Sequence, residues 1–189
     1  MGAKQEFIEI FQENVKRPGS EKLLEWLSQS DFFIAPASTK YHSAFEGGLV
    51  QHSLNVYKLL KKRCAEYGIT DGETIAICGL LHDICKANFY TISYRNAKNE
   101  RGQWEKVPYY TVDDQFPFGH GEKSVFVIER FMRLRENEAI AIRWHMGGFD
   151  DSVKAGSFGV SGAFEKYPLA VKLHLADLQA TYLLEQEKR

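Results

Sequence analysis

The chain has 189 residues, is 44% hydrophobic and carries a formal net charge of −1 at pH 7. That length and apolar content suffice for one hydrophobic core, so we expect residues 1–189 to form a single domain. The near-zero charge excludes a chain-wide basic field for nucleic acid or an anionic membrane. No apolar run approaches the roughly 20 residues of a membrane span. Because no run is long enough, we expect no membrane partner. The 3 cysteines form no CxxC pair, which indicates reduced thiols in a cytoplasmic protein.

The first half of the chain shows the apolar spacing of amphipathic helices. This spacing predicts helices over residues 4–15, 21–30, 49–67 and about 70–83, with a loop over 31–48. We expect Ser20 to cap the second helix and Gly68 to end the third, because these residue types favour those positions. Thr70 or Asp71 should begin the fourth, which leads to the adjacent pair His82 and Asp83.

The helical period breaks over residues 89–112, where aromatic and β-branched residues flank a polar, glycine-containing stretch. This pattern predicts a β-hairpin, and we expect one of its faces to pack beside the site and form a wall of the substrate pocket. Helices should follow over residues 121–133, 136–145 and 168–187, with a loop over 147–162 that can contain a helical turn. Pro168 suits the first turn of the last helix. The predicted fold class is therefore mostly α, with one inserted hairpin.

Histidines and aspartates recur in an ordered series through the predicted helices. They are His52 in GGLVQHSLNV, the pair His82-Asp83 in GLLHDICK, His120 in FGHGEKS, His145 in IRWHMGG and Asp177 in HLADLQAT. A lone histidine is more often a hydrogen-bonded core residue than a ligand. The two aspartates stand beside apolar residues, however, and a buried carboxylate needs a cation or donors. Imidazole and carboxylate together suit a divalent transition metal, so the full set favours a metal site.

The order H, HD, H, H, D resembles the HD-domain superfamily of metal-dependent phosphohydrolases in its two-metal form. The resemblance covers roughly residues 40–184, and YHSAFEGGLVQHSLNV and LLHDICK are similar to strings in bacterial HD hydrolases, including the HD domain of a 3′–5′ exoribonuclease family. The usual HDIGK stands here as HDICK. The resemblance implies an HD-domain helical bundle, with a metal-site core over about 40–184 and N-terminal helices 1–35 packed on it.

The resemblance also implies residue roles. The four ligands of the basic site match His52, His82, Asp83 and Asp177, and the additional ligands of the two-metal form match His120 and His145. Asp83 would bridge two divalent ions, which hold an attacking hydroxide. His-rich ligation suits Fe, Mn, Co, Ni or Zn better than Mg. Lys86, from HDxxK, would contact a substrate phosphate or pair with a ligand carboxylate. His42 and Arg143 would touch substrate, and a solvent-facing charge is the alternative for Arg143.

The implied activity is hydrolysis of a phosphomonoester or phosphodiester through the metal-bridging hydroxide. The substrate would be a small nucleotide-like molecule or a short nucleic-acid end. Two alternatives use the same residues: a di-iron oxygenase of the same superfamily, and a ligand-sensing HD domain without turnover. Metal analysis with reaction tests under oxygen distinguishes the hydrolase from the oxygenase.

Overall fold

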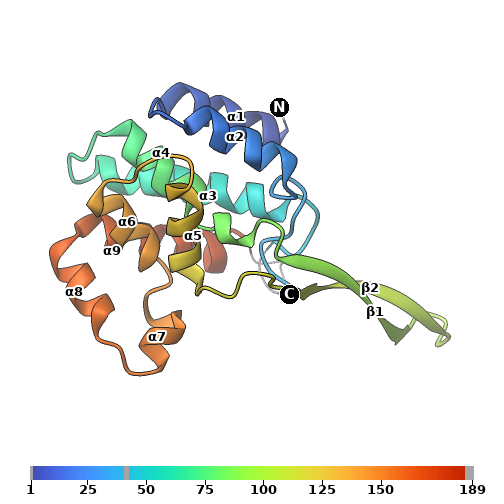
Figure 1. Ribbon diagram of the computed structural model, residues 1–189. Helices are drawn as coiled ribbons and strands as arrows, with labels where there is room; N and C mark the ends of the chain where they lie inside the picture. Colours follow the sequence, from blue (N-terminus) through green and yellow to red (C-terminus); the bar gives the residue numbers. More distant parts are fainter. Residues whose placement is uncertain (1, 41–42, 186–189) are drawn as a thin grey trace.

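The computed structural model describes residues 2–40 and 43–185, and within them the chain is mainly helical (Figure 1). The helices in chain order are α1 (Ala3–Asn14), α2 (Ser20–Gln29), α3 (Gly48–Ala65), α4 (Gly72–Leu81), α5 (His120–Glu129), α6 (Glu136–Arg143), α7 (Asp151–Lys154), α8 (Gly159–Lys166) and α9 (Pro168–Gln179). One antiparallel hairpin of β1 (Tyr90–Lys98) and β2 (Trp104–Val112) separates α4 from α5. The predicted class, a helical bundle with an inserted hairpin, is confirmed.

The helices α1 and α2 lie side by side over α3 and α4 (Figure 1). Phe7, Phe11 and Leu23 on their inner faces are buried in the same core as the central helices. The helix α2 begins at Ser20 itself, so the prediction that Ser20 caps it is wrong by one residue. Gly19 occupies the cap with φ 92°, and a Cβ there would lie 1.8 Å from the Phe131 carbonyl oxygen. Only glycine suits that close approach and that backbone conformation.

A buried ion-pair network ties this N-terminal pair to the bundle. The Arg17 guanidinium donates to both carboxylate oxygens of Glu138 on α6, at 2.6 Å each, and to Glu73 Oε2 at the start of α4 at 3.1 Å. The hydrogen bonds that Arg17 donates to Glu138 raise the pKa of Arg17 and outweigh the opposing effect of burial. The paired geometry is the strong bidentate form of an arginine–carboxylate contact.

The centre of the bundle is the pair α3 and α4. They pack closely at Gly79, where a Cβ would lie 2.6 Å from Tyr57 Cα. Of the two predicted starts of α4, Thr70 and Asp71, it is Asp71 whose side chain caps the helix, by accepting from the Thr74 amide at 3.1 Å. Every residue of α4 from Thr74 to Leu81 is buried. The helix therefore places His82, the residue that follows it, in the interior of the bundle.

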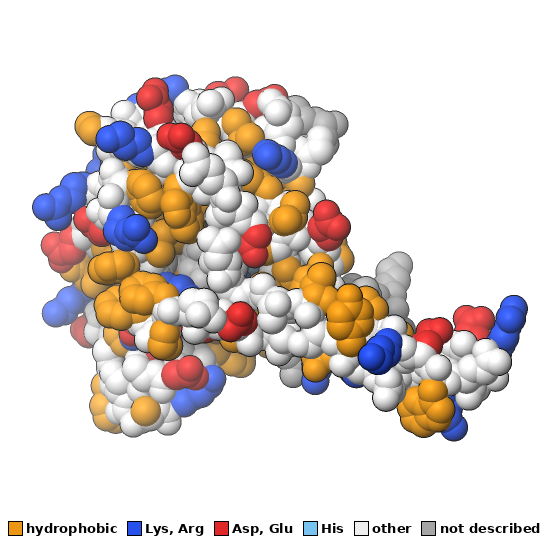
Figure 2. Space-filling model, turned by 45° about the vertical axis from the view of Figure 1, so that its right-hand side comes forward, with side chains coloured by type: hydrophobic (Ala, Val, Ile, Leu, Met, Phe, Trp, Pro, Cys, Tyr) orange, Lys and Arg blue, Asp and Glu red, His pale blue; other side chains and the backbone are white. Residues whose placement is uncertain are grey.

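The hairpin projects away from the helices as an arm (Figure 1). Tyr94 and Trp104, on one face of it, are 66% and 69% exposed, and Figure 2 shows apolar side chains along the arm. Its base contacts the body, where the Tyr90 hydroxyl donates to the Ala37 carbonyl at 3.1 Å. The prediction that one face packs on the helical body beside the site is therefore wrong, because most residues of both strands are exposed. Strands of 9 residues extend roughly 30 Å, and the end where Tyr90 pairs with Val112 lies next to the bundle while the other end projects from it.

The C-terminal half differs from prediction in one element. The predicted loop over residues 147–162 contains α7, a helical turn of 4 residues that the prediction allowed for, but also the start of α8, which it did not include. Pro168 begins α9 as predicted, and the chain then continues through a π-helical turn, Ala180–Leu184, to Glu185. The predicted end of this helix at residue 187 lies outside the described residues. Within the described part of the chain, no helix has the length and apolar character to span a membrane.

Candidate metal centre

Five segments of the bundle converge on the predicted ligand set. His52 lies on α3, His82 and Asp83 directly follow α4, His120 opens α5, His145 follows α6 and Asp177 lies on α9. The structure brings all six together in overlapping groups, each with its ligand-type atoms within 4.8 Å of one another. The groups are His52–His82–Asp177, His82–Asp83–His145 and Asp83–Cys85–His120. His42, predicted to touch substrate, lies outside the described residues.

Two of the imidazoles are oriented by helix ends. His82 Nδ1 lies 3.0 Å from the Gly79 carbonyl oxygen, and His145 Nδ1 lies 2.6 Å from that of Ile142. A carbonyl oxygen can only accept, so Nδ1 carries the proton in both rings and Nε2 presents a lone pair. The last carbonyls of a helix lack partners within it, so both hydrogen bonds also satisfy α4 and α6. Each helix end thus presents one Nε2 atom to the site.

His52 is oriented by a carboxylate that the sequence did not reveal. Its Nδ1 lies 3.0 and 3.1 Å from the two oxygens of Glu185. Its Nε2 lies 3.2 Å from Asp177 Oδ1 and 3.2 Å from His82 Nε2. Glu185 also accepts from Asn55 Nδ2 at 2.8 Å. A carboxylate behind a ligating imidazole is a common arrangement, but nothing in the local sequence marks Glu185 as that partner.

Asp83 lies at the centre of the cluster and is 2% exposed. Its Oδ1 lies 2.7 Å from His120 Nε2 and 3.4 Å from His145 Nε2. Its Oδ2 accepts from Lys86 Nζ at 2.7 Å. Burial raises the pKa of Asp83, but Lys86 and His82 outweigh it and hold that pKa well below the usual range. The carboxylate is therefore ionised, and both its oxygens face cationic or nitrogen groups.

One buried nitrogen in the cluster has no hydrogen-bond partner among the described residues. It is His145 Nε2, which points toward Asp83 Oδ1 without the geometry of a hydrogen bond. Leaving a buried polar atom unsatisfied costs about 1–3 kcal/mol, so such atoms require an explanation. A lone pair aimed at a carboxylate oxygen is repelled unless a cation lies between them. The donor set and this atom therefore fit a bound metal ion.

The pKa values of the histidines also indicate that the carboxylates of the cluster favour a positive charge beside them. Burial lowers the pKa of His52, yet the Asp177 and Glu185 carboxylates prevail and raise it to about 10. His120 also reaches about 10, because Cys85 and Asp83 outweigh the effect of burial on its pKa. His82 differs, since burial lowers its pKa to about 3. Without a metal, protons on His52 and His120 balance the carboxylates, and a divalent ion would take their place.

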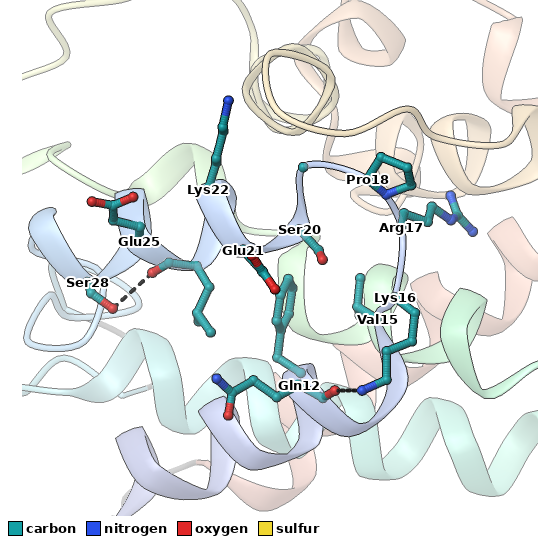
Figure 3. A pocket seen from close by; sticks show the side chains of 13 residues that line it. Gln12, Val15, Lys16, Arg17, Pro18, Ser20, Glu21, Lys22, Glu25 and Ser28 are labelled. Carbon is teal, nitrogen blue, oxygen red and sulfur yellow. Dashed lines mark hydrogen bonds between the residues drawn. The ribbon is translucent and has the colours of Figure 1, made fainter.

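A pocket of about 350 Å³ opens beside the cluster. Its lining includes Cys85, Lys86, Phe89, His120 and Lys123, so it meets the cluster at two of its members, Cys85 and His120. A larger cleft of about 920 Å³ lies at the corner between α1 and α2, where Figure 3 shows charged side chains from α2 and from the connection between the two helices. That larger cleft is lined by none of the six predicted ligands. The smaller pocket, unlike the larger cleft, therefore adjoins the site.

The structure assigns local partners to both predicted phosphate contacts. Lys86 Nζ donates to Asp83, which is the ion-pair alternative, although it also lines the pocket. Arg143 pairs with Glu122 and with Asp150 Oδ2, the latter at 2.8 Å. Its guanidinium lies 3.9 Å from the centre of the Trp144 ring. Substrate contact by Arg143 stays a prediction.

Comparison with known families decides the classification. The family model described as HD domain matches residues 49–180. The chain belongs to the HD-domain family. The match contains all six predicted ligands of the cluster but neither His42 nor Glu185.

One curated relative is similar over a shorter stretch. It is the dihydroneopterin 2′,3′-cyclic phosphate phosphodiesterase of Methanocaldococcus jannaschii, 32% identical over 84 residues. The alignment covers 42% of this chain and 31% of the relative, so the chain spans about a third of that protein. No solved structure matches.

Proposed function

We propose that this HD domain is a metal-dependent phosphohydrolase acting on a small, nucleotide-like phosphomonoester or phosphodiester. The observation that carries the proposal is the unpartnered Nε2 of buried His145, aimed at an oxygen of ionised Asp83. Family membership and the phosphodiesterase name of the relative support the same class of reaction. A cytoplasmic location stays a prediction.

Six side chains would hold two divalent transition ions. His52, His82 and Asp177 would serve one ion, and His120 and His145 the other. Asp83 stands between the two sets and would bridge them, because each of its oxygens faces a different part of the cluster. Four imidazoles with two carboxylates suit Fe, Mn, Co, Ni or Zn, whereas Mg favours oxygen ligands.

When bound, such ions lower the pKa of water toward neutrality and neutralise phosphoryl charge. The protein supplies position and charge around them. Lys86 lies at the edge of the pocket, where its ammonium can move from Asp83 to a substrate phosphate oxygen. Lys123 adds a second cation on the same lining. A pocket of about 350 Å³ is near the small end of ligand sites, which favours a small phosphoester.

The test is metal restoration to chelated protein, one ion at a time, followed by a phosphoester panel. The panel should contain nucleoside monophosphates, 2′,3′-cyclic nucleotides and short oligonucleotides, each with and without oxygen. We expect hydrolysis with Mn, Co or Ni that does not depend on oxygen. His145→Ala should abolish turnover and metal binding at one position.

The matched control is His174→Gln, because His174 is a nearby imidazole outside the ligand set and glutamine can still donate to the His145 carbonyl. This control should keep metal and turnover. If no substrate of the panel is hydrolysed with any of the ions, the proposal is refuted. Oxygen-dependent turnover of another substrate would establish the di-iron alternative in its place.

A further inference from the structure

Cys85 lies at the edge of the metal cluster. It belongs to the 3-10 turn Ile84–Lys86 directly after Asp83, and its side chain lines the pocket. Its Sγ lies 3.5 Å from His120 Nδ1 and 3.7 Å from His120 Nε2. Ligand atoms on one tetrahedral ion lie roughly 3.5 Å apart, given metal–nitrogen and metal–sulfur bonds of about 2.1 and 2.3 Å. The thiol is therefore at ligand distance from an imidazole already predicted to bind metal.

The neighbouring groups point to the same place. Asp83, Cys85 and His120 offer three ligand-type atoms within 4.8 Å of one another. His145 supplies the independent observation, because its unpartnered, buried Nε2 is aimed at Asp83 Oδ1, the oxygen that His120 contacts at 2.7 Å. A cation at this point would be shared by an oxygen, two nitrogens and a sulfur.

The other two cysteines show that this placement is particular to Cys85. Cys64 and Cys78 are fully buried in the apolar core, and burial raises the pKa of both thiols. Cys85 instead faces an imidazole and a pocket. The usual family string HDIGK has glycine at this position, which offers no ligand atom, whereas this chain has HDICK.

We propose that the Cys85 thiolate is a ligand of the ion held by Asp83, His120 and His145. The inference rests on the two-metal centre proposed above and gives it unequal halves, one sulfur-containing and one built from nitrogen and oxygen alone. Thiolate favours borderline and soft ions, so the sulfur-containing half should select Zn, Co or Fe over Mn and Mg. The other half lacks that preference.

The test uses Co²⁺ titrated into the chelated full chain, with absorption as the readout. A thiolate bound to Co²⁺ produces a near-ultraviolet sulfur-to-metal charge-transfer band, which nitrogen and oxygen ligands do not produce. We expect two Co²⁺ per chain and a band that corresponds to one sulfur. Cys85→Ser should lose the band and weaken one Co²⁺ site by about 10- to 100-fold or more. Loss of a residue that only hydrogen-bonds to a metal ligand already lowers metal affinity by that factor, so loss of a ligand should lower it at least as much. Cys85→Gly, which restores the family string, should do the same.

The matched control is Cys78→Ala, which removes a thiol of the core and should keep the band. A second readout needs no variant: Co²⁺ should protect Cys85 of the unaltered chain from alkylation, as followed by peptide mass spectrometry. Two bound Co²⁺ without a sulfur band, and without protection, would overturn the role of Cys85 and leave the two-metal centre standing. Failure to bind Co²⁺ at all would overturn both.

Discussion

Asp83→Asn removes one negative charge from the centre of the cluster while keeping the shape of the side chain. In the metal-free protein, Asp83 Oδ2 is the acceptor for Lys86 Nζ at 2.7 Å, and the two side chains are 3% and 13% exposed. Breaking a buried pair by removing one partner costs about 3–5 kcal/mol, because an uncompensated charge stays behind. We expect the free energy of unfolding of the chelated protein to fall by about that amount.

Urea denaturation of the chelated protein measures this loss, and elemental analysis of the unchelated protein measures metal. Asp83→Asn should empty at least one metal position and abolish turnover, since an amide cannot neutralise two ions. The double variant Asp83→Asn with Lys86→Met should recover most of the lost stability, because it removes the stranded charge as well, but it should recover no metal. Lys86→Ala alone should keep both metals and reduce substrate binding or rate.

Two results would contradict this reasoning. If Asp83→Asn keeps both metals and near-normal turnover, Asp83 does not bridge them. If the double variant is no more stable than Asp83→Asn, the stability loss does not come from the stranded ammonium of Lys86.

Three further predictions follow from the same geometry. Glu185→Gln should weaken metal binding by about 10- to 100-fold, because His52 loses its orienting carboxylate; equal affinity by calorimetry would contradict this. The metal-free protein should become less stable between about pH 6.5 and pH 10. The reason is that the pKa of His52 and of His120 is raised to about 10 in the folded chain. The stability that their protonation contributes is therefore complete below the pKa of the unfolded chain, and it is lost as the pH rises to the pKa of the folded chain. Melting temperature against pH, with and without metal, measures it, and a rise over that interval in the metal-free protein would refute it. Replacing residues 94–108 by a short turn should leave melting temperature and metal content nearly unchanged, because the arm leaves the body at its base; loss of metal would show otherwise.

Local sequence signals determined most of the helices and indicated the predicted ligand set. Asp71, one of the two predicted starts of α4, could be proposed from the chain because its cap hydrogen bond spans only three residues and needs nothing distant. The Nδ1 bonds of His82 and His145 likewise reach carbonyls only three residues upstream, so each histidine is oriented by its own helix end. The ordered series of histidines and aspartates could therefore be read from the chain before its fold was known.

Other features depend on how distant segments pack. Glu185 orients His52 across 133 residues of sequence, and only the packing of α9 and its π-helical turn against α3 brings them together. The contact of Cys85 with His120 likewise depends on α5 meeting the turn after α4. The hairpin was recognisable from its residues, but its projection from the bundle was not, because alternation identifies the two faces of a strand and not what covers them. By itself, the sequence indicated which residues are candidates to bind metal and on which local elements they lie. The tertiary structure alone decided which carboxylate and thiol stand beside them, because those contacts are set by the packing of helices far apart in the chain.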